Sequence, residues 1–464
     1  MGSKKNNLKR ASMSDYIAYA AYRFVEIILQ ILPLELVCII GAILGQLAYY
    51  VMPERRSIVI RNLRITYGDQ LSSAGIKSLA RKTFRYSGSN LFASIPASAM
   101  SKEELANRVQ VEGIDNLRKA SHRDKGCIML LAHMGNWEIL TQIKVLIPEM
   151  KSTASLYRPL NNPLLDDLVK RRRQKNGTQL FSRKDGFNKP IALLKSKGFL
   201  GVIADQHAGY HGIAIPFFGK MTSMTSLPAL LHRKTGAPIL PVSMITTGLG
   251  TWKVIFHPSI KTSESEKKTA YLITARCANA YEQIMSESPA DVLWMHRYWK
   301  VIRDNPLRIC GNQKKKTGIE KPSKQVALKP FNILIYLGDT PANQPEISTL
   351  IDRLKHYRTD VALTIVGSSP EHACASFTIK ASPGEPPHLL TNAIVQQDLS
   401  QNTPFDCAFE LSRNNDGGIL HKAGLPHIFA LHGKYQNSNK GRTMGNNPNL
   451  SPSQFLDNLG LPIN

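Results

Sequence analysis

The chain has 464 residues, enough for two or three domains, and its hydrophobic fraction of 42% allows sizeable buried cores. The formal net charge is +25, and it is uneven: residues 331–464 hold nine Lys or Arg and eleven Asp or Glu, so residues 1–330 carry +27. A basic surface suits nucleic acid, an anionic membrane, or an acidic protein or substrate. Because the sequence has no zinc-finger spacing, no aromatic ribonucleoprotein motif and no clear helix-turn-helix, we expect no nucleic-acid partner.

The six cysteines form no CxxC pair, and several lie in apolar stretches. This pattern is typical of reduced, buried thiols in a protein that faces the cytosol, and not of a disulfide framework or a zinc site. We therefore predict no metal and no cofactor.

The most apolar stretch lies near the N-terminus, within a predicted membrane-associated segment of residues 1–55. Leu34–Met52 is about long enough to span a bilayer, but Pro33 interrupts the stretch. Basic residues flank both sides, so the positive-inside rule gives little orientation. Three acidic or basic residues lie in or beside it: Arg23, Glu26 and Glu35. We favour two helices hinged at Pro33 that insert shallowly or anchor on the cytoplasmic face; a buried core hairpin is the alternative.

Residues 56–308 are predicted to form one domain, with helices up to about Arg108 and an α/β region from Val109 to Arg303. Four apolar runs predict strands, and periodic segments between them predict helices. The strands are Cys127–Ala132, Phe199–Ala204, Ile239–Ile245 and Trp252–Phe256, and the helices include Leu164–Lys175 and Lys189–Lys195. Strands that alternate with helices favour a mixed or largely parallel sheet covered by helices.

Residues 309–330 are polar and rich in lysine, which predicts a basic linker. A second, smaller α/β domain is predicted over residues 331–464. Its expected elements are the strand Phe331–Leu337, the helix Ile347–His356 and the strand Val361–Val366.

The motif with the clearest chemistry follows the first of these buried strands. His133 stands where the strand ends, and Glu138 follows five residues later, at the start of a predicted helix that continues through Ile139–Leu146. Open α/β sheets bind ligands at this edge, and an imidazole oriented by a carboxylate can take a proton from a hydroxyl at neutral pH. A lone histidine is more often structural, but Gly135 permits a tight turn and Asn136 can cap the helix or bind substrate.

No Ser or Cys stands beside His133 as a nucleophile, which favours direct attack by a substrate hydroxyl with His133 as general base. Further candidates for substrate binding follow along the chain, most of them polar residues on loops or strand ends. They are Arg158, Asn161, Arg171, Asp205, Gln206, Phe217 and Phe218. A solvated basic face is the alternative for Arg171, core packing is the alternative for the two phenylalanines, and His296 and Arg297 are predicted to be structural or membrane-facing.

At these residues the chain resembles the late acyltransferases of lipid A biosynthesis, the lauroyl and myristoyl enzymes, and their mycobacterial phosphatidylinositol-mannoside relatives. The resemblance covers about residues 17–303. The ordered motifs that carry it are Val111-Glu112-Gly113, His133–Glu138, Tyr157-Arg158-Pro159, Asp205-Gln206, Phe217-Phe218-Gly219 and Trp294-Met295-His296-Arg297.

The resemblance implies a glycerolipid-acyltransferase-like fold in which His133 and Glu138 are the catalytic pair. It also implies an acyl thioester donor, usually acyl carrier protein, a phosphorylated glycolipid acceptor, and a place on the cytoplasmic face of the bacterial inner membrane. The +27 charge fits an acidic carrier and anionic lipid. Two alternatives stay open: an acyl-CoA-dependent acyltransferase acting on phosphatidylinositol mannoside or another glycolipid, and an inactive membrane-bound glycolipid-binding protein.

The family usually ends soon after the Trp-Met-His-Arg segment, whereas this chain continues for about 160 residues. Within that extension, Arg413–Gly433 faintly resembles the nucleotide-sugar half of heptosyltransferase-type glycosyltransferases. The extension is long enough for only one Rossmann-like half, whereas a two-lobed glycosyltransferase needs two. We therefore expect a binding or scaffolding module.

Overall fold

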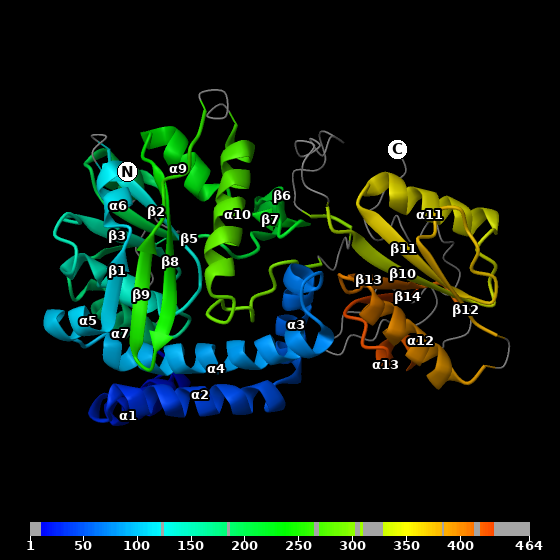
Figure 1. Ribbon diagram of the computed structural model, residues 1–464, viewed down its shortest axis with the longest axis horizontal. Coiled ribbons are helices and arrows are strands. Elements are labelled where there is room, and N and C mark those ends of the chain that lie inside the picture. The colour runs from blue at the N-terminus through cyan, green and yellow to red at the C-terminus, as the bar shows by residue number, and fades with distance from the viewer. Residues whose placement is uncertain are drawn as a thin grey trace. The chain divides into compact units, whose positions relative to one another are not determined.

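The computed structural model describes residues 11–121, 125–182, 186–263, 269–301, 307–309, 328–382, 385–412 and 418–430 (Figure 1). The described chain forms two compact units. Unit 1 comprises Met1–Val59, Lys77–Gln206 and Met224–His296, and unit 2 comprises Ile60–Ile76, His207–Ser223 and Arg297–Asn464. The predicted linker 309–330 lies largely outside the described residues, and the domain boundaries drawn from composition stay a prediction.

Unit 1 is built on a seven-stranded sheet with the strand order β1-β9-β8-β2-β5-β3-β4. Neighbouring strands are parallel except for the antiparallel pair β8 and β9. The strands are β1 (Val109–Glu112), β2 (Cys127–Leu131), β3 (Thr153–Tyr157), β4 (Gln179–Ser182), β5 (Phe199–Ile203), β8 (Ile239–Gly248) and β9 (Thr251–Phe256). The mixed, mainly parallel α/β sheet expected from the sequence is therefore confirmed.

The helices of unit 1 are α1 (Met13–Ile31), α2 (Leu34–Val51), the first part of α3 (Pro53–Tyr67), α4 (Ser73–Ala97, which starts in unit 2), α5 (Lys102–Arg108), α6 (Ile114–Ser121), α7 (Pro163–Gln174), α8 (Asn188–Lys195), α9 (Leu227–Thr235) and α10 (Ala270–Glu287). Every residue of β2 is buried, as its continuous apolar run predicts. The predicted helix Ile139–Leu146 is different: two short 3₁₀ helices, η1 (Trp137–Thr141) and η2 (Ile143–Val145), occupy this segment.

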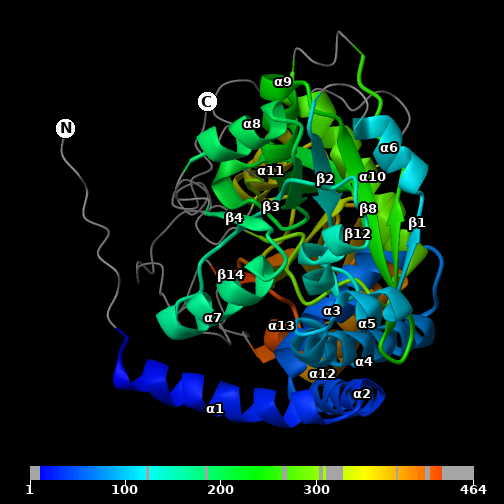
Figure 2. The same cartoon turned by 90° about the vertical axis from the view of Figure 1, so that its left-hand side faces the viewer.

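Helices α2 and α4 lie side by side in both views of the molecule (Figures 1 and 2), and glycines bring their backbones together. A Cβ atom on Gly88 would lie 2.2 Å from the carbonyl oxygen of Gly41, and one on Gly45 would lie 2.2 Å from that of Phe84. Such distances leave no room for a side chain, so this contact requires glycine. It buries one face of α2.

The other faces of α1 and α2 carry many exposed apolar side chains. They are Met13, Tyr16, Ile17, Phe24, Val25, Ile27, Ile28 and Ile31 on α1, and Leu36, Ile39, Ile43, Leu44, Leu47, Tyr50 and Val51 on α2. By length and composition α2 is able to cross a membrane, and 33% of its apolar window is buried. Pro33 separates the two helices, as predicted.

Unit 2 contains a five-stranded sheet whose paired strands are all parallel, in the order β12-β11-β10-β13-β14. Its elements are β10 (Phe331–Gly338), α11 (Pro345–Tyr357), β11 (Val361–Gly367), β12 (Phe377–Lys380), α12 (Pro387–Ser400), β13 (Cys407–Glu410), α13 (Gly418–Lys422) and β14 (Ile428–Ala430). Alternate residues of β10 enter two hydrophobic cores, one shared with α11 and the other with α12 and α13. The predicted strand–helix–strand order is thus confirmed.

A two-stranded sheet of β6 (Ile213–Phe217) and β7 (Lys220–Met224) also belongs mainly to unit 2. A short 3₁₀ turn, η4 (Gly209–His211), precedes it. The two strands are joined by Phe218 and Gly219, both at positive φ (47° and 77°).

We predict that Gly88→Val lowers the Tm in detergent by about 3–10 °C, because overpacking a tight backbone contact costs about 1–3 kcal/mol. Thermal unfolding followed by intrinsic fluorescence measures the effect. Gly75→Ala on the same helix is the control, since a Cβ there makes only ordinary contacts, at 3.4 Å or more. Equal Tm values for the two variants would contradict the packing argument.

Candidate active site

Two strands of unit 1 bring His133 and Asp205 to the same edge of the sheet. β2 and β5 are paired in parallel with Leu131 opposite Ile203, so the residues two positions beyond each strand are neighbours. Because His133 and Asp205 are 72 residues apart in the sequence, their contact depends on the tertiary fold and is not predicted by the local motif.

His133 is held by Asp205 through two hydrogen bonds. Nδ1 of the ring lies 2.7 Å from Oδ1 of Asp205, and the backbone N–H of His133 donates to Oδ2 at 3.0 Å. The side chain of Asp205 is fully buried and that of His133 is 20% exposed. Burial alone would raise the pKa of Asp205, but the interactions with His133 outweigh it and hold that pKa below its usual value. An ionised Asp205 fixes the ring proton on Nδ1 and leaves Nε2 to accept a proton.

Tyr281 of α10 locks the two strand ends together. Its hydroxyl donates to the carbonyl of Leu131 at 3.1 Å and accepts from the backbone N–H of Ala204 at 3.0 Å. Leu131 stands two residues before His133, and Ala204 stands one residue before Asp205. The tyrosine therefore sets the spacing of the two strand ends that carry the pair.

Gly135 lets the chain turn sharply after His133. It has φ +55°, and a Cβ atom there would lie 2.3 Å from the carbonyl oxygen of Met244. Its N–H donates to the carbonyl of Asp291 at 3.0 Å, and the carbonyl of His133 accepts from Leu293 at 2.8 Å. The glycine inferred from sequence to permit a tight turn does so.

The predicted contact between Glu138 and the imidazole is wrong for this structure. Both carboxylate oxygens of Glu138 accept hydrogen bonds from Arg173 of α7, at 2.9 and 2.6 Å. The reason is the local fold: Glu138 lies on the 3₁₀ helix η1, where it meets α7, while β5 supplies the carboxylate that contacts His133. The catalytic role expected of Glu138 stays a prediction.

The sequence argument missed one neighbour of His133. The ring of His296 lies 4.9 Å from the His133 ring, centroid to centroid, and its Nε2 lies 2.7 Å from Nε2 of Gln206. Burial, with the charge of His133, lowers the pKa of His296 to about 4, so it is neutral at pH 7. The ring of Trp137 also lies near that of His133, at 5.4 Å from centroid to centroid. The Trp-Met-His-Arg segment was the available signal.

The other predicted residues fall into different settings. Arg158 follows the end of β3, which pairs with β5, so it stands at the same sheet edge; it is exposed and forms no ion pair among the described residues. Asn161 is also exposed, and Arg171 pairs with Asp167 on its own helix. Asn136 is buried and does not cap η1, and neither of its amide atoms has a hydrogen-bond partner.

The aromatic pair Phe217 and Phe218 belongs to unit 2. Phe217 is fully buried and stacks on Trp299 at 5.7 Å, which favours the core-packing alternative. Phe218 contacts Tyr67. Within the described ranges, no group of three or more His, Cys, Asp or Glu side chains is placed to hold a metal ion.

The comparisons with known proteins cover the segment that contains this site. The family model for the bacterial lipid A biosynthesis acyltransferases matches residues 4–301. The lipid A biosynthesis palmitoleoyltransferase of Escherichia coli (strain K12) is 25% identical over 272 residues, which cover 58% of this chain and 86% of that enzyme. The E. coli lauroyltransferase is 24% identical over 275 residues (58% and 87%), and a phosphatidylinositol mannoside acyltransferase of Mycolicibacterium smegmatis is 25% identical over 212 residues (43% and 66%).

An α/β enzyme that transfers acyl groups is the class that these findings define. The chain belongs to the bacterial lipid A biosynthesis acyltransferase family. The prediction of an acyltransferase of this family is thereby confirmed.

We predict that Asp205→Asn lowers kcat for acyl transfer by about 100-fold or more, because an amide can stabilise the wrong tautomer of His133. Glu138→Gln, which leaves the contact between His133 and Asp205 intact, lowers kcat less. Steady-state kinetics of the two purified variants measure the difference. The reverse order would show that Glu138 acts on His133 during the reaction.

Proposed function

We propose that this protein is a membrane-associated O-acyltransferase that moves a fatty acyl chain from acyl carrier protein to a hydroxyl of a lipid A precursor. The hydrogen bond between His133 and Asp205 carries the proposal, since it prepares a general base at the carboxyl edge of the sheet. The printed names of the E. coli relatives support the acceptor class.

The chemical step needs no protein nucleophile. Nε2 of His133 takes the proton of the acceptor hydroxyl as its oxygen attacks the thioester carbonyl. The carbon–sulfur bond then breaks, and the leaving thiolate takes the proton back from His133. Asp205 remains ionised throughout and stabilises the transient imidazolium.

The charges near this edge suit anionic substrates. Arg158 is exposed and without an ionic partner among the described residues, so it is available to bind a phosphate of the acceptor. The +27 charge of residues 1–330 favours an acidic carrier and an anionic membrane. Of the three adjacent arginines of α7, Arg172 and Arg173 are engaged within the protein, with Glu26 and Glu138, respectively.

The apolar faces of α1 and α2 support a place on the inner membrane. On α1 the exposed side chains are largely apolar, whereas Glu26 is buried and pairs with Arg172 of α7. An amphipathic helix attached in this way lies along a membrane surface, on the cytoplasmic side where the thioester donor is made.

Two alternative functions are tested alongside the proposed one. The mycobacterial relative is as similar in sequence as the E. coli enzymes, which keeps an acyl-CoA donor and a phosphatidylinositol mannoside acceptor in view. A glycolipid-binding protein without activity would retain binding and lack turnover.

The decisive experiment combines both donors with both acceptors and detects the product by mass spectrometry. We expect transfer from acyl carrier protein to the lipid A precursor, and loss of more than about 100-fold in His133→Ala without loss of fold. His211→Ala, a histidine of η4 outside this site, is the control. Full activity of His133→Ala would overturn the mechanism, and transfer only to phosphatidylinositol mannoside would change the acceptor.

The membrane assignment is tested by charged substitutions on α1. Ile27→Glu combined with Ile31→Glu should weaken binding to phosphatidylglycerol-containing vesicles by about 10-fold or more, since two apolar side chains no longer enter the lipid. Flotation measures binding. Leu399→Glu on α12 is a matched control, because Leu399 is 48% exposed and Ile27 is 51% exposed. Unchanged flotation of the α1 variant would contradict this placement.

A further inference from the structure

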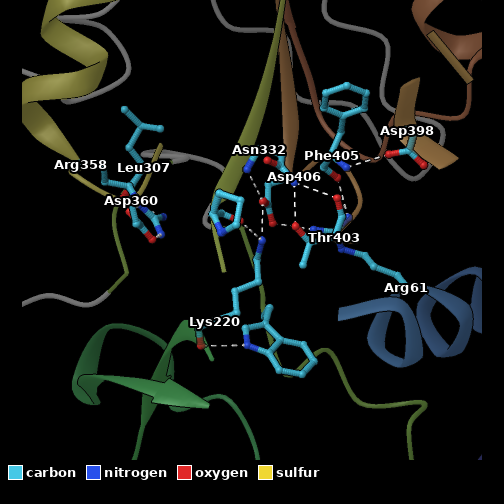
Figure 3. Close-up of polar contacts among 12 residues, drawn as sticks. Arg61, Lys220, Leu307, Asn332, Arg358, Asp360, Asp398, Thr403, Phe405 and Asp406 are labelled. Carbon is cyan, nitrogen blue, oxygen red and sulfur yellow. Dashed lines mark hydrogen bonds and ion pairs between the residues drawn. The ribbon is translucent and has the colours of Figure 1, made fainter. Parts of the chain in front are cut away.

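A buried charge cluster in unit 2 joins the family segment to the C-terminal extension, by which we mean the chain beyond residue 301. Lys220 of β7 lies within the family match, and Asp406, just before β13, lies outside it. Nζ of Lys220 is 2.7 Å from Oδ2 of Asp406, and their side chains are only 2% and 1% exposed (Figure 3). A buried ammonium needs such a counter-ion, because removing it leaves an uncompensated charge.

Asp406 satisfies several partners at once. Its Oδ1 accepts from Arg61 of α3 at 2.6 Å, and its Oδ2 also accepts from the backbone N–H of Asn332 at 2.8 Å (Figure 3). Lys220 donates in addition to the carbonyl of Pro330 at 2.7 Å. Two cations of the family segment therefore depend on one carboxylate of the extension.

The strand that carries Lys220 also binds both segments that leave the active site. The carbonyl of Ser223 accepts from the N–H of Ala208 at 2.9 Å, three residues after Asp205. The hydroxyl of Thr222 donates to the carbonyl of Tyr298 at 2.5 Å, two residues after His296.

Lys220 adds a third link. Its own carbonyl accepts from the indole N–H of Trp299 at 3.2 Å, and Phe217 of β6 stacks on the same indole. The position of β7 therefore sets where the chain continues beyond Asp205 and beyond His296.

We propose that the C-terminal extension is an integral part of the acyltransferase and that Asp406 is a positioning residue, which fixes β7 through Lys220 and thereby the segments that follow Asp205 and His296. This inference rests on the proposed roles of His133 and Asp205. It assigns the extension a part in the acyl transfer reaction and requires no second activity.

The test compares two buried aspartates in the full-length protein. Asp406→Asn removes the counter-ion of Lys220. Asp360→Asn instead breaks the buried ion pair between Arg358 and Asp360, which lies within the extension (Figure 3). The side chains of Arg358 and Asp360 are each 3% exposed. Both variants should lower the Tm, by about 5–15 °C.

The kinetic measurement is made at a temperature well below the lowest Tm. There, only Asp406→Asn should lower kcat, by about 10–100-fold, because small displacements at a site have large kinetic effects.

A double variant distinguishes the effect of the unpaired Lys220 charge from that of the altered packing. Lys220→Met combined with Asp406→Asn removes the uncompensated ammonium, so the double variant should recover at least about 3-fold of the kcat lost in Asp406→Asn alone. If Asp406→Asn does not fold, Lys220→Met alone replaces it in the comparison with Asp360→Asn, since Asp406 is then still paired with Arg61. A double variant no better than Asp406→Asn would overturn the proposal.

Hydrogen exchange provides a readout that needs no substrate, so it decides this inference even if the proposed acceptor is wrong. Asp406→Asn, or Lys220→Met in its place, should raise amide exchange in peptides covering residues 205–223 and 296–301. Asp360→Asn should raise it only in peptides after residue 301, since Arg358 also donates to the carbonyl of Leu307. Equal exchange patterns in the two variants would overturn the proposal, whereas an inactive wild-type protein with the expected patterns would overturn only the proposed function.

Discussion

The hydrogen bond between Nδ1 of His133 and Oδ1 of Asp205 is the interaction on which the site depends. It exists because β2 and β5 are adjacent, parallel and in register, so their carboxyl ends present side chains at one point. The Tyr281 hydroxyl fixes the ends of both strands, and Gly135 allows the chain to leave His133 at once. The arrangement proposed for a general base, with its tautomer set by Asp205, follows from backbone geometry that the sheet imposes.

Local patterns predict four of the seven strands in the sheet of unit 1, the strands β10 and β11 of unit 2, and the position of His133 at a strand end. β2 and β5 are continuous apolar runs, and β10 and β11 are apolar except for Asn332 and Thr364; such runs are typical of strands buried on both faces. His133 was found because it follows one of them directly. The carboxylate that contacts His133 in the structure is Asp205 and not the expected Glu138, because Glu138 is near in sequence whereas Asp205 is near only after the strands pair.

The remaining gaps also concern long-range contacts. The sequence predicts a structural or membrane-facing His296, because nothing in its own segment shows that it lies against His133. Likewise, Lys220 is one of many lysines in the sequence, and only the fold shows that it is buried against Asp406. Periodicity and motif spacing report neighbours along one element, so pairs that join distant segments lie beyond them.

The contacts of Asp406 divide the chain differently from its composition. Composition divides it into a basic enzyme and a near-neutral appendage, but contacts place β6, β7 and part of α3 in the same unit as the extension. Arg61 and Lys220, both inside the family match, share Asp406 as counter-ion. The E. coli palmitoleoyltransferase and lauroyltransferase align over 86–87% of their own length but only 58% of this chain, and the family match ends at residue 301, so the extension lies outside that match.

The most direct test of the central claim is a structure of the protein with an unreactive acyl carrier protein thioether analogue and the acceptor lipid bound. The account predicts that the acceptor hydroxyl lies within about 3.2 Å of Nε2 of His133, with Nδ1 still bonded to Asp205. A hydroxyl placed against another base, or an imidazole turned so that Glu138 replaces Asp205, would contradict it.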